Sequence, residues 1–161
     1  MRYPHAAVTL ALALTLVAGC AADRHLKRGD EARYRGDPAA AQRHYEKALL
    51  AKSKLEHDPG FMETLRLARR DAALHRGHHA MRCQQWAQAF THYNEALTHE
   101  PGFEPAQTGR DEAASRAAAN FYQQAVDHAD RGNLSDARIA LEDALRFRPG
   151  HHAAGVALDS L

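Results

Sequence analysis

The stretch HYNEALTHEPGF, residues 92–103, nearly repeats an earlier part of the same chain. Residues 44–49 read HYEKAL and residues 57–61 read HDPGF. The earlier copy differs mainly by the spacer LAKSKLE, where the later copy has only Thr98. A chain of 161 residues has room for one domain or for a short row of small units, and a motif written twice favours the row.

A third copy emerges when the alanines are aligned. The pattern A-x3-Y-x2-A-L occupies residues 41–49 and 89–97, and residues 137–145 repeat it with leucine in place of tyrosine. Pro-Gly follows each copy, at residues 59–60, 101–102 and 149–150. The copied pattern therefore recurs every 48 residues, and a fixed period in this range is typical of stacked repeat proteins.

Each copy also carries residues that end one helix and begin the next. In Gly36-Asp37-Pro38 and Gly132-Asn133-Leu134, the glycine suits a helix end, Asp or Asn caps the next helix, and proline suits a first turn. The alanines and larger apolar residues that follow share one helix face, so that neighbouring helices can pack closely. Aromatic residues are only 7% of the chain, which favours closely packed helices over a sheet. The pattern predicts an all-α fold.

The spacing of the glycine turns and the Pro-Gly pairs predicts that long and short helices alternate. We expect a long helix to end in each case near the glycine turn, and Gly109 to be the weakest point of the second long helix. The helices are expected near residues 24–35, 38–56, 60–83, 85–99, 104–131 and 134–147, with a closing helix at 151–160.

These segments resemble tetratricopeptide repeats (TPR), whose second half reads G-[ND]-x3-A-x3-[FY]-x2-A-L. Residues 132–137, GNLSDA, fit closely, whereas the first half fits less well, because the third copy has Ala125 and His128 at its conserved positions. The period is 48 rather than 34 residues, and the 14 extra residues are about four helical turns. The resemblance covers residues 24–150 and implies a right-handed stack of about three hairpins with elongated first helices, in units near 24–59, 60–101 and 102–149.

In the resembled family, the inward residues of the first helices line a groove that holds an extended peptide or a partner helix. The alternative for each such residue is plain exposure to solvent. By alignment the groove residues here are Arg33, Tyr34, Asp71, His78, Met81, Arg82, Tyr122 and Asp130.

The first residues read as a targeting signal. Arg2 precedes an apolar run at residues 6–18, which is too short to span a bilayer. The run ends in Val17-Ala18-Gly19-Cys20, which resembles the lipobox of bacterial lipoproteins. That resemblance implies a signal peptide at 1–19, a lipidated Cys20 with a short linker to residue 23, and an anchor in the outer membrane facing the periplasm. The inner membrane, or an ordinary signal peptide, is the alternative.

Other function classes find little support in the chain. Basic and acidic residues nearly balance, 21 against 20, which argues against nucleic-acid binding. No motif of a known catalytic site occurs, and we expect neither an enzyme nor a cofactor nor a small-molecule substrate. A weaker alternative is a metal site, because His75, His79 and Cys83 share one face of an expected helix.

Together these features predict a lipid-anchored periplasmic scaffold that binds another protein of the cell envelope. The alternatives are a periplasmic metal-binding lipoprotein and a structural subunit of a secretion or pilus complex. Once Cys20 is lipidated, Cys83 is the only remaining thiol, so stability must come from packing rather than from an internal disulfide.

Overall fold

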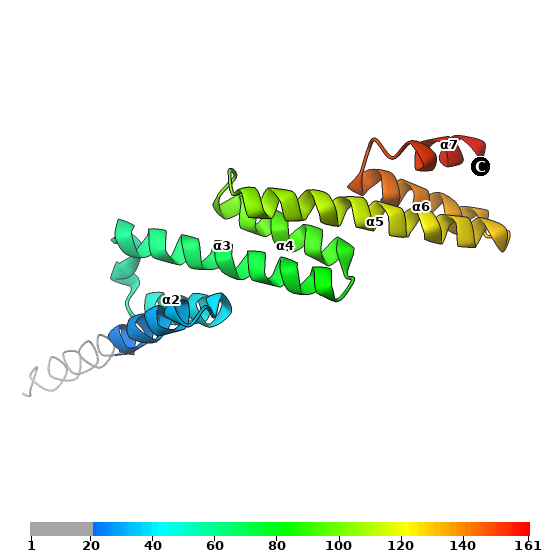
Figure 1. Ribbon diagram of the computed structural model, residues 1–161. Coiled ribbons are helices and arrows are strands. Elements are labelled where there is room, and N and C mark those ends of the chain that lie inside the picture. Colours follow the sequence, from blue (N-terminus) through cyan, green and yellow to red (C-terminus); the bar gives the residue numbers. More distant parts are fainter. Residues whose placement is uncertain (1–20) are drawn as a thin grey trace, which may run out of the picture. The chain divides into compact units, whose positions relative to one another are not determined.

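The computed structural model describes residues 21–161, and every regular element within that range is a helix (Figure 1). The prediction of an all-α fold is confirmed. The predicted signal peptide and Cys20 lie outside the described residues. Residues 21–34 are helical, and the other elements are α2 (Pro38–Ala51), η1 (Ser53–His57), α3 (Pro59–Arg82), α4 (Trp86–His99), α5 (Glu104–Asp130), α6 (Leu134–Phe147) and α7 (His152–Ser160).

Most helix bounds lie within a residue or two of the predicted ones. The long helices α3 and α5 and the short helices α4 and α6 all form, and α5 runs without a break through Gly109. The N-terminal helix already includes residues 21–23, which had been assigned to a linker. The positions of glycine and proline were therefore sufficient to predict that long and short helices alternate.

The prediction for the first short helix was wrong at its end. α2 stops at Ala51 instead of continuing to residue 56, because Lys52 leaves the helical region with φ −145° and ψ 87°. The short helix η1 follows and turns Leu55 into the core, where that side chain is 8% exposed. Seven residues after the buried Ala48, Leu55 would face the core in a continued α-helix as well, so its burial is compatible with either geometry.

The turns that follow the first helix of each pair share one geometry. Gly36, Gln84 and Gly132 all have positive φ, at 73°, 59° and 76°. In each turn the next residue's N–H reaches back to a carbonyl five residues earlier, as in Asp37 N–H to Ala32 O at 2.9 Å. This is the Schellman arrangement, which satisfies the last carbonyls of a helix and favours glycine at the left-handed position. Gln84 adopts a conformation that costs an L residue energy.

The chain divides into two compact units, with the boundary after His75, inside α3. In the N-terminal unit the helix at 21–34, α2, η1 and the first part of α3 share one core. Small side chains allow close helix approach, and Tyr45, Phe61 and Leu65 fill the remaining space. The buried cluster contains Ala32, Ala41, Tyr45, Ala48, Leu55, Phe61, Leu65 and Ala68.

In the C-terminal unit, α4 packs on α5, α5 on α6, and α6 on α7. Phe147 of α6 joins these layers, because its ring meets Phe90 of α4 edge-on at 5.2 Å and stacks on Phe121 of α5 at 5.6 Å. Among residues 21–161 no polar or charged residue is fully buried, so each unit is stabilised internally by apolar packing.

We name three hairpins: residues 21–34 with α2, the end of α3 (76–82) with α4, and α5 with α6. The same kind of contact occurs inside each of the first two hairpins. A Cβ built on Gly29 would lie 2.5 Å from Tyr45 Cε1, and one on Gly77 would lie 2.5 Å from Tyr93 Cε1. These distances are shorter than any real carbon contact, so both tyrosine rings press directly on the backbone of the facing helix.

Candidate functional site

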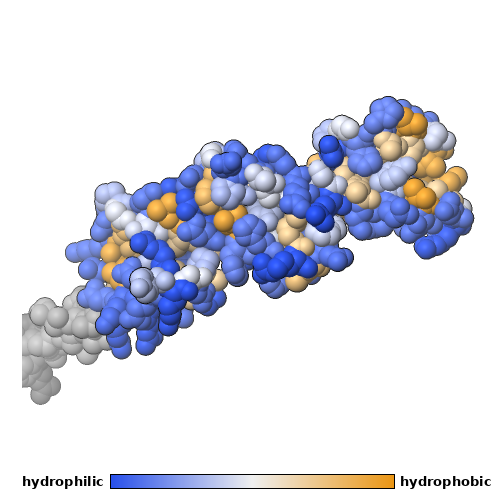
Figure 2. Space-filling view, viewed as in Figure 1, coloured by the Kyte–Doolittle hydropathy of each residue, from blue (hydrophilic) through white to orange (hydrophobic). Residues whose placement is uncertain are grey.

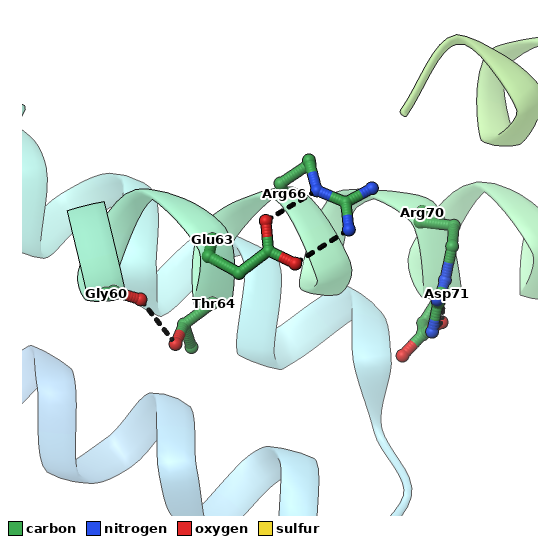
Figure 3. Close-up of polar contacts among 6 residues, drawn as sticks. All are labelled: Gly60, Glu63, Thr64, Arg66, Arg70 and Asp71. Carbon is green, nitrogen blue, oxygen red and sulfur yellow. Dashed lines mark hydrogen bonds and ion pairs between the residues drawn. The ribbon is translucent and has the colours of Figure 1, made fainter. Parts of the chain in front are cut away.

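The predicted groove residues of the N-terminal unit lie on two helices. Arg33 and Tyr34 are at the end of the helix at 21–34, and Tyr34 is 95% exposed. Asp71 lies on α3, where Arg70 donates two hydrogen bonds to its Oδ1, at 2.7 and 2.8 Å (Figure 3). Asp71 therefore already has a cationic partner, whereas the large ring of Tyr34 stands in solvent and offers apolar contact area.

The remaining groove residues belong to the C-terminal unit. His78, Met81 and Arg82 occupy the last turns of α3, and Tyr122 and Asp130 lie on α5. The rings of His78 and Tyr122 each contact another ring. The centroids of His78 and Tyr93 are 5.7 Å apart in an edge-on contact, and those of Tyr122 and His151 are 5.3 Å apart. The eight predicted residues are thus divided between the two units, three in one and five in the other.

Helices α5, α6 and α7 line a half-open cavity of about 160 Å³, and its surface is mostly apolar. Its walls include Tyr122 and Val126 of α5, Leu141 of α6, Ala157 of α7, and Leu161. A pocket of this size and lining can accept an apolar side chain of a partner. Of the residues that line this cavity, only Tyr122 was predicted from the sequence to be a binding residue. The leucine that replaces tyrosine in the third copy was the signal that could have revealed the cavity.

Large apolar side chains are exposed around the same helices. Ile139 of α6 is 59% exposed, Val156 of α7 is 57% exposed, and Leu161 is 39% exposed. Figure 2 shows apolar surface over this part of the C-terminal unit. Leu161 lines the cavity, whereas Ile139 lines a separate hollow with Asp136 and Asp143. Exposed apolar side chains are available to a partner protein, because covering them is favourable.

A second hollow, of about 220 Å³, lies beside the start of α4. Trp86 and three glutamines form one side of it, and Phe121 of α5 forms part of the other. The Arg116 guanidinium lies 5.0 Å from the Trp86 ring centroid, which holds the indole in place through a cation–π contact. The glutamine amides offer both donors and acceptors, which suits contact with a peptide backbone.

The suggested metal ligands do not form a complete site. Cys83 Sγ lies 3.8 Å from His79 Nδ1, a distance typical of a weak thiol–imidazole contact. Within residues 21–161, no group of three or more His, Cys, Asp or Glu side chains is placed to hold a metal ion. A tightly bound metal needs three or four protein ligands, and His75, His79 and Cys83 do not come together as such a set.

Across the described part of the chain, none of the helices has both the length and the apolar character that crossing a bilayer requires. Comparison with known proteins finds no matching family, and no curated protein or solved structure of significant similarity.

Proposed function

We propose that the protein is a lipid-anchored, TPR-like scaffold that binds another protein of the cell envelope. The observation that carries the proposal is the repeat itself. Three turns of equal geometry recur with a 48-residue period, and the same glycine–tyrosine contact occurs in two hairpins. Repeated helical hairpins bury their apolar faces against one another and present extended surfaces, which proteins of this kind use for binding partners.

In this proposal the partner is an extended or helical segment with at least one large apolar side chain. That side chain enters the cavity between α5, α6 and α7, and Tyr122 connects the cavity to the predicted groove. Arg33 of the N-terminal unit and Arg82 of the C-terminal unit are both exposed, and each contributes a charged contact of its own. Tyrosine and arginine are the residue types that most often carry binding energy at interfaces.

The anchor supplies the other half of the function. Acyl chains on Cys20 hold the scaffold at the periplasmic face of the outer membrane, since a residue with several chains binds a bilayer almost permanently. A tethered binding surface raises the local concentration of its partner without improving any individual contact. Assembly or regulation of an envelope complex is the role that follows from this arrangement.

The test is an affinity purification from solubilised membranes with four forms of the full chain. They are the wild type, Arg33→Glu with Arg82→Glu, Ala157→Trp, and the control Arg138→Glu. Ala157→Trp fills the cavity, whereas Arg138 is exposed on a short helix outside the predicted groove. We expect a partner in fixed stoichiometry with the wild type and the control, and its loss with the other two.

An identical set of captured proteins in all four samples would contradict the groove and the cavity together. Loss with Ala157→Trp alone would restrict the binding site to the C-terminal unit. Mass spectrometry of the protein extracted from membranes tests the anchor separately, and an unmodified Cys20 in the mature protein would overturn that part of the proposal.

A further inference from the structure

The first hairpin carries a cluster of basic side chains around two stacked histidines. His25 and His44 face each other with ring centroids 5.7 Å apart and Nδ1 atoms 3.4 Å apart. Burial lowers the pKa of His44, and the nearby charges of His25, Arg28, Lys47 and Arg43 lower it further. Arg43 and Lys47 flank His44 on α2, and Arg28 lies one turn after His25 on the facing helix, so the three cations lie around the two rings.

The three cations in the cluster are exposed, and among residues 21–161 none of them forms an ion pair with a carboxylate. Arg28 comes from the helix at 21–34, whereas Arg43 and Lys47 are one helical turn apart on α2. Neighbouring positive charges that form no ion pair repel one another, so binding of an anion beside them is favourable.

The same positions in the other hairpins show that this charge is specific to the first one. A shift of 48 residues places Arg76 and Glu95 in the second hairpin at the positions of Arg28 and Lys47, and their side chains form an ion pair at 2.7 Å. The hydrogen bond from Arg76 keeps the pKa of Glu95 below its usual value, although burial acts in the opposite direction. In the second hairpin the charges therefore cancel.

In the third hairpin the charge at these positions is negative instead of positive. The equivalent positions hold Gln124, Ile139 and Asp143, which line a shared surface hollow of about 210 Å³ together with Asp136. This hollow shows that the positions lie side by side between the two helices of a hairpin. Residues 21–52 contain eight basic and five acidic residues, whereas residues 104–147 contain five and eight, so the polarity extends beyond the cluster.

We propose that the basic face of the first hairpin, formed by His25, Arg28, Arg43, His44 and Lys47, binds the phosphate groups of anionic phospholipids at a membrane surface. Clustered lysine and arginine side chains bind such surfaces because each gains from the negative surface potential. The choice of a lipid surface over a free phosphate rests on the proposed anchor, since Cys20 is only five residues from His25 in the sequence. Bound this way, the first hairpin is oriented at the bilayer.

Vesicle flotation of the full chain tests this inference. Vesicles of phosphatidylcholine alone and with added phosphatidylglycerol are compared, because only the anionic lipid reports on charge. The test variant is Arg43→Gln with Lys47→Gln. The control is Arg131→Gln with Arg138→Gln, which removes the same net charge from exposed positions of the C-terminal unit.

We expect the wild type to prefer anionic vesicles, and this preference to fall by about 30-fold in the test variant, since each basic side chain near the surface contributes about a factor of five. The control retains the preference. Raising the salt concentration weakens wild-type binding, because exposed charges are screened. Circular dichroism of both variants checks the fold, which exposed substitutions of this kind leave nearly unchanged.

Equal loss in the two double variants would mean that only net charge matters, and would overturn the inference. So would equal binding to both kinds of vesicle. Displacement by inorganic phosphate, beyond the effect of chloride at equal ionic strength, would identify a free-phosphate site instead and also overturn it. Acylation of Cys20 and partner capture are measured independently, so failure here is distinguishable from failure of the scaffold proposal.

Discussion

The second and third hairpins place residues of different size at the same point of contact. Tyr93 lies between two glycines, and a Cβ on Gly77 or Gly109 would come within 2.5 Å of its ring. A shift of 48 residues puts Leu141 at this place in the third hairpin, where Ala125 and Ala157 replace the glycines and line the cavity of about 160 Å³. A large ring thus requires bare backbone on both neighbouring helices, whereas leucine tolerates methyl groups but leaves space.

In the first hairpin the residue at this position, Tyr45, has a third set of neighbours. Tyr45 presses on Gly29, but its other neighbour is Phe61, whose ring meets it edge-on at 6.3 Å. The Tyr45 hydroxyl donates a hydrogen bond to Asp30 at 2.7 Å. Position 30 becomes His78 in the second hairpin and Val126 in the third, so the polar partner disappears together with the tyrosine. The repeat keeps its backbone geometry while neighbouring side chains change together.

Truncation of the central residue should cost more in the second hairpin than in the third. We expect Tyr93→Ala to lower the free energy of unfolding by about 3–5 kcal/mol, because a ring that is 2% exposed leaves a large new cavity. Leu141→Ala should cost only about 2–3 kcal/mol, at the low end of its class, because part of the space beside it is already empty. Urea unfolding followed by circular dichroism measures both, and a larger cost for Leu141→Ala would contradict this account.

Adding a methyl group beside the tyrosine should be the next largest effect. Gly77→Ala is expected to lower the free energy of unfolding by about 1–3 kcal/mol through overpacking against Tyr93. Gly155→Ala is the matched control, since that helical glycine has open space around it and alanine should stabilise by about 0.5–1 kcal/mol.

The same substitution in a Tyr93→Leu background copies the third hairpin. There the cost of Gly77→Ala should nearly vanish, because leucine does not reach the position of the ring. A double-mutant cycle gives the coupling energy directly. A coupling near zero would show that the glycine is required for a reason other than the ring.

The turn of the second hairpin offers a smaller, stabilising change. Gln84 has φ 59°, whereas the equivalent positions of the other turns are glycines. Gln84→Gly should raise the free energy of unfolding by about 0.5–1 kcal/mol, since relief of the left-handed strain exceeds the added flexibility of the unfolded chain. Gly132→Gln should have the opposite sign. Thermal and urea unfolding of both variants test the pair, and destabilisation by Gln84→Gly would be inconsistent with a strained turn.

Tyr45 and Tyr93 differ in what raises the pKa of the hydroxyl, because only Tyr45 donates a hydrogen bond to Asp30. Burial, followed by this hydrogen bond, raises the pKa of Tyr45 from 10.0 to about 12, and burial also raises the pKa of Tyr93. The folded chain keeps both protons while the unfolded chain releases them. This contribution to stability is therefore complete below pH 10 and is lost as the pH rises from 10 towards 12.

Asp30→Asn should lower the pKa of Tyr45, because the negative charge that opposes its ionisation is removed. Glu31→Gln, at the adjacent exposed position, should leave it unchanged. The tyrosinate absorbance measured against pH reports the difference. An unchanged titration in Asp30→Asn would mean that burial alone keeps the Tyr45 proton in place.

Local residue chemistry was enough to predict most helix bounds but not the contacts that depend on partners far along the chain. The end of α2 was missed because nothing in the local residue pattern marks Lys52, where the backbone leaves the helical region. Of the predicted groove residues, Asp71 is already paired with Arg70, and only the neighbourhood of Tyr122 forms part of an apolar cavity. Neither fact is visible from spacing, because ion pairs and cavities depend on side-chain direction and on the packing of other helices.

The amino-acid pattern was sufficient to predict an all-α chain with a 48-residue period and the positions of its turns, because glycine, proline, capping residues and alanine spacing act within one or two helical turns. The folded structure was needed to show why Tyr93 has glycine neighbours and Leu141 has a cavity, and that the basic residues of the first hairpin gather around two stacked histidines. These features arise where separate helices meet, and there the available volume and the local charge are set jointly by residues distant in sequence.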